Sequence, residues 1–212
     1  MRARIGQVVP IPLDRKSVAE ARTAKTVAKG GLIVVGSHVP TTTRQLSALL
    51  EEGNSQVVEL DVRTVISDRD ETYLKETAAK VAGLLEEENV VLYTSRNLVT
   101  GTNAEESLAI ARQVSSALIT VVNSAVHEVK PQFVIAKGGI TSSDVASRGL
   151  EMTRAMVIGP MLPGIISLWQ LGDGPLAGVP YIVFAGNVGD ERSLVHVVNT
   201  LSQDKRSNKH NA

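Results

Sequence analysis

A lysine, two glycines and a run of hydroxyl residues form the segment of this chain that is best suited to chemistry. It reads Lys137-Gly138-Gly139-Ile140-Thr141 and follows the apolar run 133–136. Glycines let backbone amides approach an oxyanion because no Cβ stands in the way, and a helix beginning at Thr141 or Ser142 would direct unpaired N–H groups toward it. A plain tight turn has the same pattern. The segment alone therefore leaves phosphate binding and a structural turn equally open.

Two more apolar runs end in small turns. Gly36-Ser37 follows 32–35, and Gly186-Asn187 follows 181–184. If the three runs are parallel strands of one sheet, all three turns lie along one edge, where α/β proteins place their ligands. This convergence favours a phosphate or nucleotide site at the carboxyl ends of the strands.

Each side chain in these turns has a functional and a structural interpretation. Ser37 would bind a phosphate or ribose, or would simply occupy a strand-end turn. Lys137 would neutralise phosphate as a point charge, or would be solvated. Thr141 suits both a helix cap and a phosphate neighbour. Gly186 and Asn187 would contact the nucleotide, or would form a tight turn with Asn187 in the left-handed region.

Several other residues are weaker candidates. His38 is a possible base, although an exposed loop histidine is the simpler interpretation. Asp144 and the pair Asp190-Glu191 would support Mg²⁺ or complement a helix dipole. The stretch 159–171, which contains Trp169, would wall a nucleotide pocket, although packing in the core or an interface is the simpler interpretation of Trp169 itself. We identify no catalytic residue, and the four histidines do not form a metal-binding pair, so no protein metal site is predicted.

The alternation of short β-branched runs with helical patterns predicts an α/β fold: a mostly parallel sheet with helices on both faces. One helix is expected to begin near Ser67, where Ser67 and Asp70 have capping-box spacing. Another is capped by Asn103 with Glu106 and should bury one long stripe. The expected strands are 32–35, 56–60, 90–93, 133–136, 155–158 and 181–184; the expected helices cover 41–52, about 67–85, 103–129 and the segments after 141 and 190; and the stripe comprises Ala104, Leu108, Ala111, Val114, Leu118, Val121, Ala125 and Val129.

Composition limits the function classes. Lys+Arg and Asp+Glu both total 22, so no net charge favours nucleic acid. Cysteine is absent, which fits a cytoplasmic protein, and no apolar run approaches a membrane span in length. We expect a lead-in at 1–30, one nucleotide-binding domain at 31–201 and a disordered tail at 202–212. The fingerprints of P-loop enzymes, dinucleotide-binding folds and serine hydrolases are missing.

Five short blocks in order resemble the C-terminal nucleotide-binding domain of the four-carbon acid sugar kinases. They are Val-Val-Gly-Ser at 34–37, Pro-x-Thr-x-Arg-Gln-Leu at 40–46, Gly-Gly-x-Thr-Ser at 138–142, Val-x-Gly-Pro-x-x-Pro-Gly at 157–164 and Gly-Asn-x-Gly at 186–189. The resemblance runs from about Gly31 to Val198. It implies ATP as co-substrate with Mg²⁺, and phosphorylation of threonate, erythronate or a 3-oxo-tetronate by a longer protein whose N-terminal domain binds the sugar acid.

By this resemblance Ser37, Gly138 to Thr141 and Gly186 match nucleotide-contacting positions. Ile140 departs from the family, which commonly has Asp there, and Lys137 stands where Thr is frequent. The resemblance implies that this chain binds ATP or ADP but lacks the substrate lobe and does not phosphorylate a sugar acid alone; a homodimer is compatible with it. Two alternatives stay open: a non-catalytic, effector-type interaction module, and a regulatory domain that binds sugar phosphates.

Overall fold

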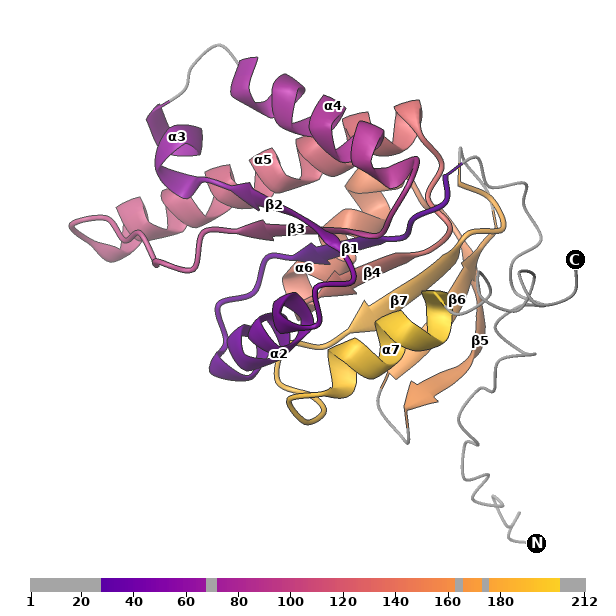
Figure 1. The fold of residues 1–212 in the computed structure, drawn as a ribbon. Helices are drawn as coiled ribbons and strands as arrows, with labels where there is room; N and C mark the ends of the chain where they lie inside the picture. The colour runs from indigo at the N-terminus through magenta and orange to yellow at the C-terminus, as the bar shows by residue number, and fades with distance from the viewer. Residues whose placement is uncertain (1–27, 68–71, 163–165, 173–175, 203–212) are drawn as a thin grey trace, which may run out of the picture.

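The computed structural model describes residues 28–67, 72–162, 166–172 and 176–202, and its strands form one seven-stranded sheet (Figure 1). The strand order is β2-β3-β1-β4-β7-β6-β5. The strands are β1 (Leu32–Val35), β2 (Gln56–Leu60), β3 (Val90–Thr94), β4 (Val134–Lys137), β5 (Ala155–Leu162), β6 (Ile166–Leu171) and β7 (Pro180–Phe184); the helices are α2 (Pro40–Glu51), α3 (Val62–Ser67), α4 (Thr72–Leu85), α5 (Ala104–Glu128), α6 (Gly139–Asp144), the π-helix η1 (Val145–Gly149) and α7 (Ser193–Ser202).

The sheet is parallel from β2 to β7 and antiparallel in the β7-β6-β5 part. This confirms the predicted mostly parallel α/β fold. The strand β6 was not predicted, because the glycines and prolines of 159–180 indicate loops. The structure accommodates Gly159 and Pro160 in β5 at the sheet edge, where the pairing with β6 shifts register.

Helices cover both faces of the sheet (Figure 1). Because side chains alternate along a strand, Ile33 and Val35 pack with α2 and α7, whereas Leu32 and Val34 pack with α4 and α5. Both clusters are buried, and β1 is an interior strand, flanked by β3 and β4. The fold therefore holds the carboxyl ends of β1, β3 and β4 rigidly beside one another.

Helix α5 is longer than the sheet can cover. Its cap is as predicted, since the Asn103 Oδ1 accepts from the Glu106 N–H at 2.8 Å. The predicted stripe is wrong at Ala104, Leu108 and Ala111, which are exposed. Figure 1 shows the reason: the N-terminal half of α5 extends past the carboxyl edge of the strands, so no strand lies beneath it.

The expectation about membrane spans needs a correction for α5. This helix has 25 residues, and its most apolar window reaches a mean hydropathy of 1.2, which is enough to cross a membrane by length and composition only. Of that window 39% is buried inside the structure. Core helices of soluble proteins pass the same test, so the finding is weak evidence for a membrane span.

The helix start expected near Ser67 is wrong. Ser67 is the last residue of α3, where its Oγ donates to the Thr64 carbonyl at 3.2 Å, and α4 is described from Thr72. Asp70, the other half of the expected capping box, lies outside the described residues.

The expected domain ends also extend slightly. Ala28 is already buried in the core, and α7 continues to Ser202. Residues 1–27 of the expected lead-in at 1–30, and residues 203–212 of the expected disordered tail at 202–212, lie outside the described residues.

Candidate functional site

The three glycine-containing turns meet at one edge of the sheet. They follow β1, β4 and β7, which are neighbours and parallel. A Cβ built on Gly138 would stand 2.9 Å from the Cβ of Ser37, and one on Gly186 would stand 3.0 Å from the Ser37 Oγ. Ser37 therefore lies in contact with both other turns, as the sequence predicted from strand topology alone.

Gly138 turns the chain from β4 directly into α6. Its φ of 122° and ψ of 142° are favourable only for glycine. Its carbonyl accepts the Ser142 N–H at 2.8 Å. The helix begins at Gly139, earlier than predicted, so Thr141 lies within its first turn and is not the cap.

A buried tyrosine on the sheet hydrogen-bonds this short helix. The Tyr181 hydroxyl, on β7, donates to the Ser142 carbonyl at 2.6 Å. Burial raises the pKa of Tyr181, so the hydroxyl keeps its proton and remains a donor. We expect Tyr181→Phe to lower the free energy of unfolding by about 1 kcal/mol, as measured by urea denaturation. An unchanged midpoint would show that the bond does not hold α6.

A cavity of about 610 Å³ opens beside these glycines, on the α5 side of the sheet. That volume lies within the range of small-molecule sites. Most of its lining is apolar. It is lined by residues 36–39 after β1, Val62, Thr94, the loop 97–100, one face of α5 (Ser107, Ile110, Ala111, Val114, Ser115 and Leu118) and residues 138–141.

Ser37 and His38 bring polar groups to this cavity. The Ser37 Oγ accepts the Val39 N–H at 3.3 Å, which closes the turn after β1. The His38 Nε2 lies 3.0 Å from the Ser95 carbonyl and must donate to it, because a carbonyl only accepts. In the neutral ring the Nδ1 is then an acceptor. His38 is half-exposed and is therefore held in one tautomer rather than freely solvated.

Lys137 lies on the opposite face of the sheet from the cavity. It follows Ile135 in alternation, so its side chain points to the α2 and α7 side. The side chain is fully buried, and its Nζ donates to the carbonyls of Ala185 at 2.6 Å and Gly186 at 3.3 Å. The expectation of a solvated lysine is therefore wrong, and the geometry does not bring this amine to the cavity. Burial lowers the pKa of Lys137 to about 7.

The turn after β7 has a structural role in the described contacts. The Gly186 carbonyl accepts the Thr42 hydroxyl at 2.8 Å, which ties the turn to α2. Gly186 is buried and Asn187 is exposed, and neither lines the cavity. The left-handed conformation expected at Asn187 is wrong: within this turn it is Gly189 that has a positive φ, of 82°.

The acidic candidates are engaged in local contacts. Asp190 accepts the Ser193 hydroxyl at 2.7 Å, and this bond lowers the pKa of Asp190. Glu191 does not line the cavity. Asp144 accepts the Ser115 hydroxyl at 3.1 Å. The described residues contain no group of three or more metal-ligating side chains, and Ile140 offers no ligand atom, so they do not fit a Mg²⁺ site built by this chain alone.

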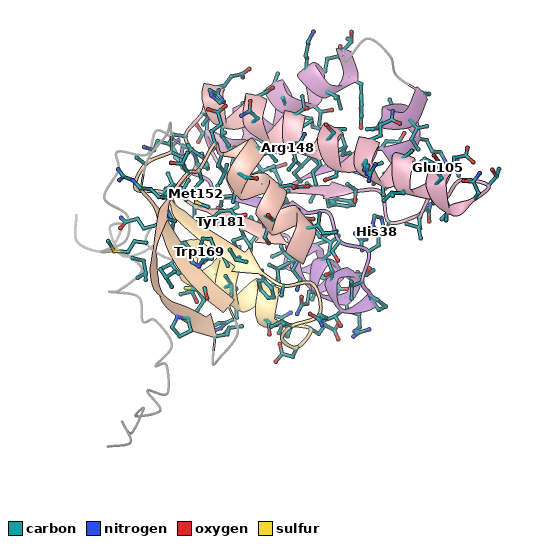
Figure 2. All side chains as sticks on the ribbon, turned by 180° about the vertical axis from the view of Figure 1, so that it is seen from behind. His38, Glu105, Arg148, Met152, Trp169 and Tyr181 are labelled. Atoms are coloured by element: carbon teal, nitrogen blue, oxygen red, sulfur yellow. The ribbon has the colours of Figure 1, made fainter. Side chains whose placement is uncertain are left out.

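Trp169 lies away from the cavity, in the β6 part of the sheet. Figure 2 shows it beside Tyr181 and far from His38, and the Trp169 and Tyr181 ring centroids are 6.4 Å apart. Trp169 packs against the buried core. The structure thus favours the packing interpretation, and the segment 159–171, where described, does not wall the cavity.

Sequence reasoning placed the polar loop that begins at Thr94 at a strand end, where α/β sheets bind ligands, but missed the overhanging face of α5 that shapes the rest of the cavity. The polar loop after β3 was visible as a strand-end segment, but its contact with α5 depends on how far that helix extends past the sheet. The length of the apolar stripe relative to the short strands was the one available signal.

Fold and site together define a class: a doubly wound α/β domain whose ligand cavity lies where neighbouring strands send their helices to opposite faces. Residues 32–194 match the family model of a nucleotide-binding C-terminal domain. The chain therefore belongs to this family, which is part of the four-carbon acid sugar kinase (DUF1537) family. No curated protein matches the chain.

Solved structures share the fold. A Bordetella bronchiseptica domain of unknown function (DUF1537), with bound citrate and as a domain-swapped dimer, has a TM-score of 0.63 and 20% identity, over 88% of this chain and 44% of its own. A Haemophilus influenzae DUF1537 protein has a TM-score of 0.58 and 21% identity, over 84% of this chain and 42% of its own. A putative tRNA synthase from Salmonella typhimurium has a TM-score of 0.60 and 16% identity, over 81% of this chain and 40% of its own. This chain thus spans less than half the length of these proteins.

Proposed function

We propose that this chain is the ATP-binding half of a kinase that phosphorylates a four-carbon sugar acid such as threonate, erythronate or a 3-oxo-tetronate. The sugar acid would bind mainly to a second lobe, in keeping with the greater length of the solved relatives. Mg²⁺ would accompany the nucleotide and be held chiefly by its phosphates and water.

One observation carries the nucleotide assignment. Gly138 and Gly139 line a cavity at the carboxyl edge of the sheet, next to Ser37, in a chain that matches a nucleotide-binding family. At Gly139 a phosphate can approach the backbone amides at the start of α6 without meeting a side chain, since nothing lies within 4 Å of a Cβ built on this residue.

The chain's own residues supply only part of phosphoryl transfer. Positioning and charge stabilisation of the transferred group would come from backbone amides and the Ser37 hydroxyl. A base for the acceptor hydroxyl also has to be present. His38 is the one ionisable side chain among the described residues that line the cavity, and its accepting Nδ1 makes it the candidate this lobe offers.

Calorimetric titration of the purified chain with ATP, ADP and AMP tests this proposal. We expect ATP and ADP to bind more tightly than AMP, because the glycine loop contacts the outer phosphates, and we expect no turnover with a four-carbon acid alone. Failure of every adenine nucleotide to bind, to this chain and to the longer protein, would overturn the proposal. Stabilisation by sugar phosphates but not by nucleotides would favour a regulatory domain instead.

A further inference from the structure

The cavity has two chemically different ends. Extending the strand register by one residue beyond Val35 places Gly36 between Thr94 of β3 and Gly138 of β4. The β4 end has glycines and backbone amides. The end toward β3 and β2 is lined mainly by apolar side chains, among them Val62, Val99, Ile110 and Val114, with Asn97, Thr100 and Ser107 beside them. A ligand with one charged and one apolar part therefore fits in only one direction.

The apolar end exists because α5 overhangs the sheet. Burial along α5 begins at Ala117, and the turns before it present Ile110, Ala111 and Val114 to the cavity. Figure 2 shows Glu105 at the outer end of this overhang, well away from the hairpin that holds Trp169. A helix face of this kind normally packs against a strand, and here it faces the cavity instead.

Thr94 supplies an unpaired polar group at this end. As the last residue of β3 it follows Val90 and Leu92 in alternation, so its side chain lies on the α5 side. It is 1% exposed and lines the cavity. Its Oγ1 has no hydrogen-bond partner within the described part of the chain. A buried hydroxyl without a partner costs stability, which makes a ligand partner the physical reason for keeping it.

We propose that the purine base of the nucleotide lies under the α5 overhang, against Ala111, and that the Thr94 hydroxyl hydrogen-bonds the nucleoside. This inference rests on the proposed function. It orients the ligand with its phosphates on Gly138 and Gly139 and its base toward β2. The flat faces of a purine suit apolar walls, and the unpaired Thr94 hydroxyl can hydrogen-bond a nitrogen or oxygen atom of the nucleoside.

A larger side chain at the apolar end of the cavity should weaken binding of the base and leave binding of the phosphates unchanged. The variant Ala111→Gln adds an uncharged side chain inside the cavity, and Ala109→Gln adds the same group to an exposed position of α5 that does not line it. Affinities for ATP, and for inorganic tripolyphosphate by displacement of ATP, are measured by calorimetry. We expect Ala111→Gln to weaken the affinity for ATP about tenfold and to leave the affinity for tripolyphosphate within twofold. Ala109→Gln should change neither affinity.

The outcomes distinguish this inference from the proposed function. If the unmodified chain binds neither ATP nor tripolyphosphate, the proposed function fails. If ATP binds but Ala111→Gln leaves its affinity unchanged, or if ATP and tripolyphosphate bind equally well, the base does not lie here and the inference is overturned while nucleotide binding stands.

Thr94 has its own test, with a readout that a packing role would not produce. The variant Thr94→Val keeps the shape and removes the hydroxyl, and Thr94→Ser keeps the hydroxyl. We expect Thr94→Val to weaken ATP about 3- to 10-fold while raising the melting temperature of the free chain by about 2–4 °C. Thr94→Ser should retain ATP affinity. A lower melting temperature for Thr94→Val with unchanged affinity would show that the hydroxyl serves only the fold.

Discussion

Replacing Gly138 with alanine is expected to destabilise the chain by about 3 kcal/mol and to abolish ATP binding. Two costs add at this position. The φ of 122° with a ψ of 142° is a conformation that residues with a Cβ rarely adopt. The new Cβ would also stand 2.9 Å from the Cβ of Ser37, which cannot move away without opening the turn after β1. Chemical denaturation and calorimetry measure the two effects.

Alanine variants of two other glycines distinguish effects on stability from effects on ATP binding. At Gly139 the φ is not positive and nothing lies within 4 Å of an added Cβ, so Gly139→Ala should fold normally. Its methyl would occupy the space through which phosphate approaches, and ATP affinity should fall at least about tenfold. At Gly83, inside α4 and equally uncrowded, alanine should leave binding unchanged and stabilise the chain by about 0.5–1 kcal/mol.

The pattern across the three variants decides the interpretation. Loss of binding in Gly138→Ala and Gly139→Ala, with loss of stability only in the first, fits a phosphate cradle built on a glycine-only conformation. Normal ATP affinity in Gly139→Ala would contradict a phosphate at this loop, whatever Gly138→Ala does.

The parts of this fold that the sequence predicted correctly are those with local causes. Runs such as 32–35 and 133–136 are short and β-branched or apolar, and the helices between them require parallel pairing. Parallel pairing then places the turns at 36–37, 138–139 and 186–187 along one edge without any knowledge of side-chain contacts. The nucleotide-binding family match agrees with that convergence.

The features that the sequence did not predict depend on where each strand or helix ends and on which face of the sheet a side chain lies. The strand containing Lys137 ends one residue later than predicted, so its side chain is buried on the α2 side and does not reach the cavity. Thr94 looked like the first residue of a loop and is the last of a strand. The α5 overhang arises from a 25-residue helix beside strands of four or five residues. None of these follows from periodicity alone.

Replacing Lys137 with methionine is expected to change how stability depends on pH. Burial lowers the pKa of Lys137 from 10.5 to about 7 in the folded chain. Its bonds to the Ala185 and Gly186 carbonyls, and the Phe184 ring 3.9 Å from its Nζ, favour the charged form and limit that shift. Between pH 7 and 10.5 the unfolded chain binds one proton more than the folded chain.

Unfolding therefore takes up a proton in this range, and the Lys137 contribution to stability rises with pH. Below pH 7 the lysine is charged in both states and contributes no slope. From pH 7 to 9 the unmodified chain should gain up to about 2 kcal/mol relative to Lys137→Met. The difference between the two chains cancels the titration of all other groups, and Lys80→Met, at an exposed position on α4, controls for the loss of any lysine.

Urea denaturation at pH 7, 8 and 9 measures the effect, and ATP titration of the same variants separates two roles for the amine. An amine that only ties the turn after β7 to β4 should leave ATP affinity within a few-fold in Lys137→Met, because Gly186 keeps its bond from Thr42. If the amine instead neutralised phosphate, its removal in Lys137→Met would weaken the affinity for ATP by about a hundredfold or more. The opposite-face geometry predicts the smaller effect together with the pH slope. Parallel stability curves for the two chains would show that the buried lysine keeps its ordinary pKa.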